Sequence, residues 1–469
     1  MAHAARLFFK PSSEQTLHAR ITPSTEQFEA QQARWNDLAD FLRARLKDDT
    51  GYPISTWLQG SYKFGTQIRP SQTGQEFDVD LGLYFEWRGE DDAGDYDPSG
   101  FKEFVQNALE DYAADDDNDA RDVDEPKERC ARVHFEPDFH IDVPCYHLDR
   151  DDDRRALATE TQGWENSDPK AIYKWFRDLD EDAARTLIRR LVRYLKMWAA
   201  IKIDDDVDRP SSIMLTVLAG EEFENIDRTA CDGDDELLEA LITLIADRFE
   251  KSTEVANPVD QEEDLNRLSD EASATFAIKL REFEEIARRA NAATNEETAA
   301  EIWTEAFEHF FPMPEDMEEN EGETSATKQA EKQGTALATY AFDPRISVRA
   351  VSKDNPNYKK EGINSLPLVC KNCRIFFKLE NASELPVGAS IRWTVRNKGR
   401  DAWRINDIGH LSGDGYTAEE NSAYNGKHSM DVTIYQFGRI IGRRRVEIDV
   451  RGNAMPARQL PRKRGFVRK

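Results

Sequence analysis

The first third of the chain mixes helical and strand-like patterns of apolar residues. Ser24 and Gln27 have the spacing of a capping box, and the apolar residues that follow recur every three or four positions. This pattern predicts an amphipathic helix over residues 25–47. Period-two alternation, which is typical of half-buried strands, is present in several later segments. The expected elements are strands at 54–58 and 77–86, a helix from Pro98, and a strand hairpin at 130–135 and 139–146.

Beyond residue 180 the pattern changes twice. Up to Phe311 the apolar residues follow helical spacing, which predicts a helical bundle. Residues 312–340 are rich in Glu, Gly, Ser, Thr and Lys and contain few apolar positions, so an acidic linker is expected there. After Tyr340, short alternating segments separated by Gly, Asn and Pro predict an all-β sandwich. The helices are expected at 180–202, 213–219, 236–249, 272–290 and 295–311, and the strands at 346–351, 374–379, 390–395, 431–437 and 445–450.

These patterns predict an α/β (α+β) core followed by a smaller β domain. A chain of 469 residues is too long for one ordinary hydrophobic core, which favours two domains. Most basic tails are disordered, but this one would also suit acidic partners or the acidic surface of its own chain. The expected parts are a core with a helical lobe at 1–311, the acidic linker at 312–340, the sandwich at 341–455 and a basic tail at 456–469.

The compartment follows from what the sequence lacks. No run of about 18 apolar residues is present, so no membrane-spanning helix is expected. The first residues lack the apolar core of a signal peptide. Five cysteines, an odd number, indicate reduced thiols and a cytoplasmic protein. Cys370 and Cys373 have the spacing of half a zinc site, but the other half is not visible, which favours thiols buried at a turn.

The net charge of −28 bears on the partners of the protein. Acidic runs recur along the chain, and such a surface repels nucleic acid, so strong nucleic-acid binding is not expected. Two interpretations of the excess charge stay open. One is adaptation to a salt-rich host, in which surface carboxylates keep the protein hydrated. The other is a mildly acidic cytoplasmic enzyme with solvated loops.

Three aspartates lie on the polar faces of two predicted strands. Alternation places Asp78 and Asp80 together on the polar face of segment 77–86, and it turns Asp142 away from the apolar face of segment 139–146. Carboxylates two residues apart on a strand are separated by ~6–7 Å along the backbone. Such a pair repels by roughly 3 kcal/mol at an effective dielectric near 20. A divalent cation between them would turn this repulsion into attraction.

A turn that contains glycine and serine precedes the first two aspartates. The segment from Leu58 to Thr66 reads Leu-Gln-Gly-Ser-Tyr-Lys-Phe-Gly-Thr. It supplies small residues, hydroxyls and backbone N–H groups, which suit the phosphates of a nucleotide. Gly65 would let the chain turn close to a bound nucleotide. The alternative is an ordinary turn before a helix.

The order of these motifs resembles that of the polymerase-β-like nucleotidyltransferases. A Gly-Ser pair, an Asp-x-Asp pair and a single aspartate on a later strand form the pattern. In its fuller form it is similar to the cGAS/DncV-like branch (CD-NTases), the nucleotide second-messenger synthases of bacterial antiphage (CBASS) systems. The resemblance covers roughly residues 20–310, and it rests on Gln59-Gly-Ser-Tyr-Lys-Phe-Gly-Thr66, Glu76-Phe-Asp-Val-Asp-Leu81 and Asp142.

The C-terminal part has a resemblance of its own. Ile391-Arg-Trp-Thr-Val-Arg-Asn-Lys-Gly399 and Ala423-Tyr-Asn-Gly-Lys-His428 are similar to the AGS-C domain, a proposed sensor module found behind such synthases. These phrases are less specific than the catalytic motifs. The resemblance implies that the sandwich senses a regulatory protein or ligand.

The first resemblance also implies roles for particular side chains. Asp78, Asp80 and Asp142 would hold two Mg2+ ions, with Mn2+ as a substitute, and Asp142 would lie nearest the acceptor hydroxyl. Solvated acids on the outer face of a strand are the alternative. The residues expected to bind the nucleotide are Gln59, Gly60, Ser61, Lys196, Ser211, Ser212 and Asp264.

Several of these nucleotide-binding roles have plain alternatives. Lys196 lies on a predicted helix, where most lysines face solvent. Ser211 or Ser212 would bind the triphosphate, but either could be the N-cap of the next helix. Asp264 would help to read the nucleobase, or it would belong to a turn that caps a helix.

The implied function is synthesis of a cyclic oligonucleotide from NTPs, with purines expected. The product would switch on a downstream effector. One alternative is a template-independent transferase that tails RNA or AMPylates protein, although the acidic charge disfavours RNA. Another is a non-catalytic nucleotide-binding module, which the intact set of three aspartates disfavours.

Overall fold

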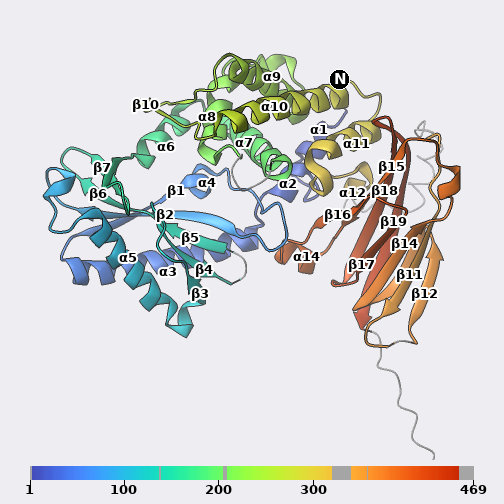
Figure 1. Cartoon of the computed structure of the whole chain (residues 1–469), viewed down its shortest axis with the longest axis horizontal. Helices are drawn as coiled ribbons and strands as arrows, with labels where there is room; N and C mark the ends of the chain where they lie inside the picture. Colours follow the sequence, from blue (N-terminus) through green and yellow to red (C-terminus); the bar gives the residue numbers. More distant parts are fainter. Residues whose placement is uncertain (1–2, 137–138, 204–208, 319–339, 356, 454–469) are drawn as a thin grey trace, which may run out of the picture. The chain divides into compact units, whose positions relative to one another are not determined.

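The chain divides into two compact units, residues 1–323 and 324–469. The computed structural model in Figure 1 describes residues 3–136, 139–203, 209–318, 340–355 and 357–453. Within the described residues, no helix combines the length and apolar character that a membrane span requires.

Strand β2 (Phe77–Glu86) is the central strand of the first unit. It pairs in parallel with β5 (Phe139–Val143) along its first half and with β6 (Cys145–Asp149) along its second half. Pro144 separates these two short strands. The mixed sheet has the order β3-β4-β5-β2-β6-β7-β8, with β1 (Ile54–Gln59) also paired to β2. The remaining strands are β3 (Ala120–Val123), β4 (Ala131–Phe135), β7 (Arg154–Ala158) and β8 (Trp164–Asn166).

Two helices cover one face of this sheet, α3 (Thr25–Thr50) and α5 (Pro98–Ala113), as Figure 1 shows. The predicted capping box at the start of α3 is present, because Ser24 and Gln27 exchange side-chain and backbone hydrogen bonds. Both helices bury apolar residues against the apolar faces of β2 and β5. Side chains alternate along a strand, so the residues between these apolar positions on β2 and β5 point to the other side of the sheet.

The helical part of the first unit lies above the sheet in Figure 1. Its five longer helices confirm the predicted bundle and differ from the expected bounds by a few residues. Short elements in between were not predicted. The helices are α7 (Asp182–Lys202), α8 (Ser212–Phe223), α9 (Asp234–Lys251), α10 (Asp270–Asn291) and α11 (Glu296–Phe307), and the shorter elements are α6 (Pro169–Asp178), β9 (Ala256–Asn257) and β10 (Asp260–Asp264). In the sheet part, the short helix α4 (Gly60–Phe64) directly follows β1.

The N-terminal residues complete the core of this helical bundle, which the sequence patterns did not indicate. They form α1 (Ala5–Phe8) and α2 (Leu17–Ile21). The ring of Phe8 lies 4.8 Å from that of Trp303, 5.2 Å from that of Phe311 and 5.3 Å from that of Tyr194, each distance between centroids. Residues from both ends of the first unit thus share one aromatic cluster.

The first residues of the predicted linker segment are folded. Helix α12 (Pro314–Glu318) lies inside the segment 312–340, and Met313 and Met317 are fully buried. Met313 directly precedes the helix and Met317 lies within it, and both are buried in the first unit. Acidic neighbours hid this short apolar repeat in the sequence. Residues 319–339, and the tail from residue 454, lie outside the described residues.

The second unit is a β-sandwich, as predicted. Its two sheets have the orders β12-β11-β14-β17 and β13-β19-β18-β15-β16, and their apolar faces enclose one core. The elements are β11 (Ile346–Ser352), β12 (Lys359–Ile363), β13 (Ser365–Lys371), β14 (Cys373–Leu379), β15 (Ala389–Arg396), α14 (Arg400–Arg404), β16 (Gly409–Gly413), β17 (Thr417–Asn421), β18 (Gly426–Gln436) and β19 (Arg439–Asn453).

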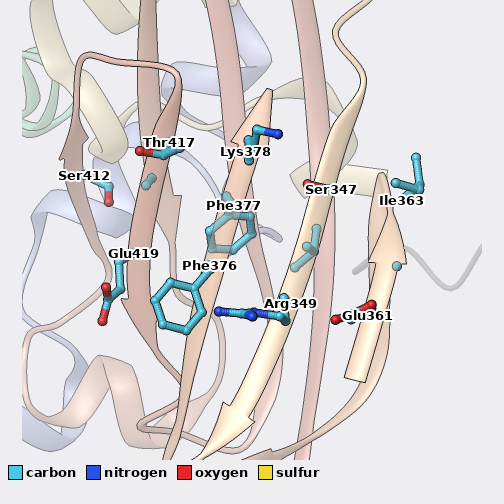
Figure 2. Close-up of a pocket in the computed structure, with 13 residues that line it drawn as sticks. Ser347, Arg349, Glu361, Ile363, Phe376, Phe377, Lys378, Ser412, Thr417 and Glu419 are labelled. Carbon is cyan, nitrogen blue, oxygen red and sulfur yellow. The ribbon is translucent and has the colours of Figure 1, made fainter. Parts of the chain in front are cut away.

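The outer face of the four-stranded sheet is an open hollow of about 1100 Å³ (Figure 2). Phe376 of β14 lies at its centre, and the guanidinium groups of Arg349 and Arg374 lie 5.0 and 5.4 Å from its ring. Glu361 and Glu419 flank this stack on the neighbouring strands. These charged side chains cover the apolar ring of Phe376 on the solvent-facing side of the sheet, so the ring is not an exposed hydrophobic patch.

The Cys370 and Cys373 pair flanks the turn between β13 and β14. Asn372 in this turn has a left-handed backbone, with φ of 59°. The hydroxyl of Ser422 joins the two cysteines, since it donates to the carbonyl of Cys370 and accepts from the N–H of Cys373, both at 2.8 Å. Neither cysteine belongs to a three-residue metal-binding group among the described residues.

A buried ion pair joins α7 to α9, so the stability of the helical part depends on one carboxylate. Asp234 accepts from Arg190 Nε at 2.6 Å and Nη2 at 2.7 Å, and from the hydroxyl of Tyr194 at 2.8 Å. Both side chains of the pair are less than 10 % exposed. Removing one partner of such a pair leaves the other charge buried without compensation.

We therefore expect Asp234→Ala to lower the free energy of unfolding by about 3–5 kcal/mol. Asp247 offers a matched control, because it lies on the same helix and pairs with Arg281 at the surface. Asp247→Ala should cost less than about 1 kcal/mol. Urea denaturation of the full-length variants measures both. Equal losses for the two variants would contradict the importance of the buried pair.

Candidate active site

The three predicted aspartates come together on the face of the sheet opposite α3 and α5. Strands β2 and β5 run parallel in the register that sets Asp80 opposite Asp142 and Asp78 opposite His140. Oxygens of Asp78 and Asp142 and a ring nitrogen of His140 all lie within 4.8 Å of one another. The strand alternation read from the sequence therefore gives the correct face for all three carboxylates.

Gly60 holds the closest backbone approach to this group. It follows β1 with a left-handed φ of +55°, and a Cβ atom built on it would lie 1.7 Å from Asp80 Oδ2. Any side chain here would displace that carboxylate. Gly60 is thus required twice, by its backbone angle and by the space that Asp80 occupies. Ser61 follows directly in α4, and Gly65 ends that helix with a φ of +67°.

The charges of the three aspartates act on one another. Burial raises the pKa of Asp80 well above its usual value, and the charges of Asp78 and Asp142 raise it further. Burial also acts to raise the pKa of Asp78, but the contact with His140 and the positive charges of Arg132 and Lys196 outweigh it, so the net pKa is lowered. Negative charge at Asp80 is therefore undercompensated by the protein alone. A set of close carboxylates with excess negative charge fits divalent cations that prefer oxygen ligands.

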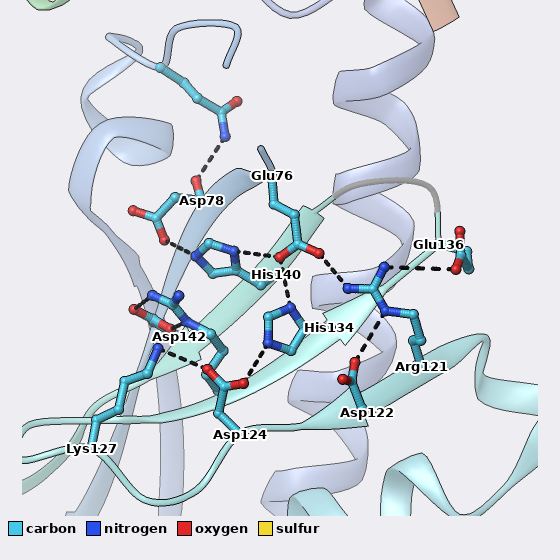
Figure 3. A network of polar contacts seen from close by, with 12 residues as sticks. Glu76, Asp78, Arg121, Asp122, Asp124, Lys127, His134, Glu136, His140 and Asp142 are labelled. Atoms are coloured by element: carbon cyan, nitrogen blue, oxygen red, sulfur yellow. Dashed lines mark hydrogen bonds and ion pairs between the residues drawn. The ribbon is translucent and has the colours of Figure 1, made fainter. Parts of the chain in front are cut away.

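A chain of polar contacts extends from Asp78 to the edge of the sheet (Figure 3). His140 Nε2 lies 3.2 Å from Asp78 Oδ1, and its Nδ1 lies 3.0 Å from Glu76 Oε2. The same Glu76 oxygen lies 2.7 Å from His134 Nδ1. Glu76, His134 and His140 form a second group that could hold a metal ion. His140 is shared by both groups, so it orients the side chain of Asp78.

Asp142 is bound by a neighbouring arginine. Arg132 lies directly opposite Asp142 in the antiparallel pair of β4 and β5. Its guanidinium donates to both carboxylate oxygens, at 2.5 and 2.8 Å. This two-pronged contact fixes the orientation of Asp142 and offsets its charge. Any cation that binds Asp142 has to share the carboxylate with Arg132.

A cavity of about 200 Å³ begins at Asp78 and runs between the sheet and the helical part. Ser61, Lys196 and Ser212 line it together with Asp78. Lys196 does not face open solvent: it is 6 % exposed, and its Nζ donates to the carbonyl of Thr66 at 3.1 Å. Burial lowers the pKa of Lys196 to about 8, against the opposing effect of Asp78. The structure thus brings three of the predicted phosphate-binding residues to one cavity.

The two adjacent serines separate into different positions. Ser211 is the N-cap of α8, because its hydroxyl accepts from the N–H of Met214 at 3.2 Å. Ser212 is the first residue of the helix and lines the cavity. The structure therefore identifies Ser211 as the cap, and the nucleotide-binding role of Ser212 stays a prediction.

Gln59, predicted to line the phosphates, does not line this cavity, and its side chain is engaged elsewhere. Gln59 is buried and its amide is occupied, since Nε2 donates to Tyr84 at 2.9 Å and Oε1 accepts from the Tyr146 hydroxyl at 3.1 Å. It lies across Gly82, where a Cβ would come within 1.9 Å of Nε2. Gln59 therefore braces β1 against β2 and β6. A glutamine beside a Gly-Ser turn gives no sequence signal for this role.

Asp264 is not part of the aspartate group or of its cavity. It ends strand β10, and its Oδ1 accepts from the N–H groups of Val255 and Asn266, at 2.9 and 2.8 Å. These contacts close the loop between α9 and α10, as in an ordinary Asp-stabilised turn. The structure therefore supports the turn alternative for Asp264.

Sequence reasoning missed several residues of the site. Arg132 and His134 alternate with inward apolar residues on β4, and His140 does so on β5. The same parity argument that identified Asp142 would have placed them beside it, because the hairpin was predicted. Arg69 and Arg209, which also line the cavity, carry no such pattern.

Comparison with known proteins agrees with this geometry. The family described as the cyclic GMP-AMP synthase DncV-like nucleotidyltransferase domain matches residues 54–146. The family described as the adenylyl/guanylyl and SMODS C-terminal sensor domain, AGS-C, matches residues 325–451. The first match spans the Gly-Ser turn and all three aspartates, and the second spans the sandwich.

Relatives extend the similarity over most of the chain. A cyclic GMP-AMP synthase of Escherichia albertii is 29 % identical over 457 residues, which is 96 % of each chain. A c-di-GMP synthase of Roseivirga ehrenbergii is 27 % identical over 290 residues, 55 % of this chain and 73 % of that protein. The crystal structure of the Vibrio cholerae DncV cyclic AMP-GMP synthase with nonhydrolyzable GTP has a TM-score of 0.57 at 20 % identity, over 67 % of this chain and 98 % of that one. The fold, the ordered motifs and both family matches agree: residues 54–146 belong to the DncV-like nucleotidyltransferase domain family, and residues 325–451, which follow it, belong to the AGS-C family.

Proposed function

We propose that the protein is a Mg2+-dependent synthase of cyclic oligonucleotides. It takes two or three nucleoside triphosphates, joins them through phosphodiester bonds and releases pyrophosphate. The observation that carries the proposal is the group of Asp78, Asp80 and Asp142, in which Asp78 also lines the cavity formed with Ser61, Lys196 and Ser212. The names of the relatives, which are cyclic dinucleotide synthases, support cyclisation and purine substrates.

Each transfer balances as one displacement at phosphorus. A 2′- or 3′-hydroxyl oxygen of the acceptor forms a bond to the α-phosphorus of the donor, and the bond between that phosphorus and the β-phosphate oxygen breaks. The hydroxyl proton leaves to a base or to water, and pyrophosphate departs. The linear product keeps a 5′-triphosphate, so the same displacement within one molecule closes the ring.

Asp78, Asp80 and Asp142 would hold the Mg2+ ions, or Mn2+ in their place. Bound there, the ions would neutralise triphosphate charge and lower the pKa of the attacking hydroxyl. Other residues of the chain hold these carboxylates in position. Gly60 leaves room for Asp80, and Arg132 and His140 orient Asp142 and Asp78. These contacts fix the carboxylates before substrate binds, which is how a site avoids reorganisation during the reaction.

The triphosphate would lie in the cavity. The Lys196 ammonium, held by the carbonyl of Thr66, supplies positive charge at its wall. The hydroxyls of Ser61 and Ser212 would supply further donors, one from α4 and one from α8. Since the first comes from the sheet part and the second from the helical part, a bound triphosphate would connect the two.

The biological setting is part of the same proposal. A bacterial antiphage role, in which the cyclic product activates an effector in the cytoplasm, agrees with the type of relative matched. The AGS-C match, described as a sensor domain, supports regulation by a ligand or protein at the sandwich. A template-independent transfer to RNA or protein is the second candidate, and the same assay separates the two.

We expect the purified protein with NTPs and Mg2+ to make a phosphatase-resistant small product. The double variant Asp78→Asn/Asp80→Asn should lose at least about 10³-fold in rate, because several kcal/mol of metal-based stabilisation are removed. EDTA should abolish the product, and added Mn2+ should restore it. Mass spectrometry identifies a cyclic product.

The control is Asp95→Asn, at an exposed loop position of the same unit, which should leave the rate unchanged. Label transferred to RNA or protein instead of a small product would favour the second candidate. A linear product that does not close would contradict cyclisation.

Gly60→Ala tests the close approach to Asp80. The substitution should reduce the rate by about 10²-fold, since displacing a catalytic group by about 1 Å has effects of that size. Gly74 is the matched control, because it too has a positive φ, of +87°, but a Cβ there meets nothing within 4 Å. Both alanines share the cost of a left-handed backbone, about 1–2 kcal/mol. Similar rates for the two variants would show that the contact with Asp80 is unimportant.

Paired substitutions test the assignment of the serines. Ser212→Ala should raise the KM for NTP by about tenfold, which corresponds to a lost hydrogen bond to a charged group. Ser211→Ala should leave KM unchanged and lower the free energy of unfolding by about 1 kcal/mol through the lost cap. Steady-state kinetics and urea denaturation measure the two effects. The reverse outcome would exchange the two roles.

A further inference from the structure

The sandwich contains a second cavity, of about 270 Å³, at one end of its core. Its walls come from both sheets: Ile375 and Phe377 from the four-stranded sheet, and Met430 and Ile448 from the five-stranded one. These residues are buried members of the apolar core. The cavity is therefore a slot between two apolar walls, which is the shape that accepts a flat molecule.

Polar residues occupy inward-facing positions at the mouth of this slot. In the antiparallel pair of β15 and β16, His410 lies opposite Val395, which in turn lies opposite the buried Met430. In the other sheet, Glu420 lies opposite the buried Ile375. Residues that are directly opposite share one face of a sheet. The chain thus places an imidazole and a carboxylate where a sandwich normally has apolar side chains.

The polar side chains at the mouth are held in a connected frame. Asn397 Nδ2 donates to Asp407 Oδ1 at 3.1 Å, and its Oδ1 lies 3.1 Å from His428 Nδ1. The hydroxyl of Tyr424 donates to Asp407 Oδ2 at 2.7 Å. Buried polar groups of this kind destabilise a core unless their hydrogen bonds are satisfied. When they are satisfied, they hold donors and acceptors in fixed directions, which gives a binding site its specificity.

His410 connects this frame to a second carboxylate, because its Nδ1 lies 4.0 Å from Asp407 Oδ1. His410 Nε2 lies 3.1 Å from Glu420 Oε1, and this contact raises the pKa of His410. His428 is the more enclosed imidazole, and burial lowers its pKa. The mouth therefore contains two carboxylates, Asp407 and Glu420, against one favoured cation. Its net negative charge opposes the entry of phosphates.

We propose that this slot is a binding site for an uncharged, flat heterocycle of nucleobase or nucleoside size. The apolar walls of the two sheets would cover the faces of the ring. His410 and Glu420 would bind its polar edge, while His428 and Asn397, whose polar atoms already have partners, would form the wall beside it. The site is distinct from the aspartate cavity, which is lined by residues of the first unit only, and the proposal does not depend on the activity proposed above.

The test is binding of unphosphorylated nucleosides to the full-length protein. Adenosine, guanosine, cytidine and uridine are titrated by calorimetry, each beside its 5′-monophosphate. At least one nucleoside should bind with a Kd below about 1 mM, at least tenfold more tightly than its monophosphate. Failure of all four nucleosides to bind would overturn the proposal.

Variants locate the binding. His428→Leu removes the inward imidazole and places an apolar side chain in the slot, so it should weaken binding by at least tenfold. The matched control is Lys427→Leu, the preceding residue of the same strand, which is exposed and points to the opposite face. It should bind as the wild type does. Glu420→Gln gives a milder change in case His428→Leu unfolds, and it should weaken binding at least threefold.

Nucleosides could also enter the aspartate cavity, so a further variant has to show that the measured binding does not occur there. Asp78→Asn/Asp80→Asn should therefore keep nucleoside binding, whether or not synthase activity is detected in the wild type. Binding lost in this variant but kept in His428→Leu would assign the nucleoside to the aspartate cavity and overturn the proposal. A monophosphate that binds as tightly as its nucleoside would overturn the charge argument behind it.

Discussion

The site depends on the parallel register between β2 and β5. One face of this strand pair is apolar and packs against α3 and α5. Because side chains alternate along a strand, the burial of that face directs the intervening residues to the opposite face of the sheet. The shared register then puts Asp80 beside Asp142 across a single strand spacing. A slip of one residue would turn the carboxylates into the core, where they could not be paired. The hydrophobic core thus determines the position of the polar site.

Concentrating three carboxylates has an energetic cost that the surroundings partly offset. Arg132 binds one aspartate and His140 contacts another, whereas Asp80 has carboxylate neighbours and raised pKa. The protein stabilises the two outer charges and leaves the inner one to be compensated by something that binds. Gly60 contributes by allowing the carboxylate of Asp80 to lie against the backbone. The same residues that destabilise the isolated chain therefore favour a charged ligand.

Sequence patterns predicted a side chain's position correctly wherever its direction follows from its own strand or helix. Period-two alternation gave the strands and the faces of Asp78, Asp80 and Asp142, and the capping box gave the start of α3. The patterns failed where a side chain's partner lies far away in the chain. Gln59 is held by two tyrosines, and no local rule reveals them.

Short segments were the other source of error. The bundle contains Phe8 and Met317, which come from elements of four and five residues. Such elements carry too few positions for a period to be recognised. Lys196 illustrates the intermediate case, since its helix was predicted but its burial depends on how that helix packs on the Gly-Ser turn. Tertiary packing, which no window of sequence contains, decided these positions.

The aromatic cluster around Phe8 has a consequence for the synthesis of the chain. Its partners Trp303 and Phe311 are made some 300 residues later, which at about 5–20 residues per second means on the order of 15–60 s of translation. During that interval the N-terminal segment has no completed bundle to join. The sheet and α3 can assemble from nearby segments, but the helical part has to wait for its last helix. The order of synthesis therefore delays the cavity between the sheet and the helical part, because Lys196 and Ser212 in its wall belong to that helical part.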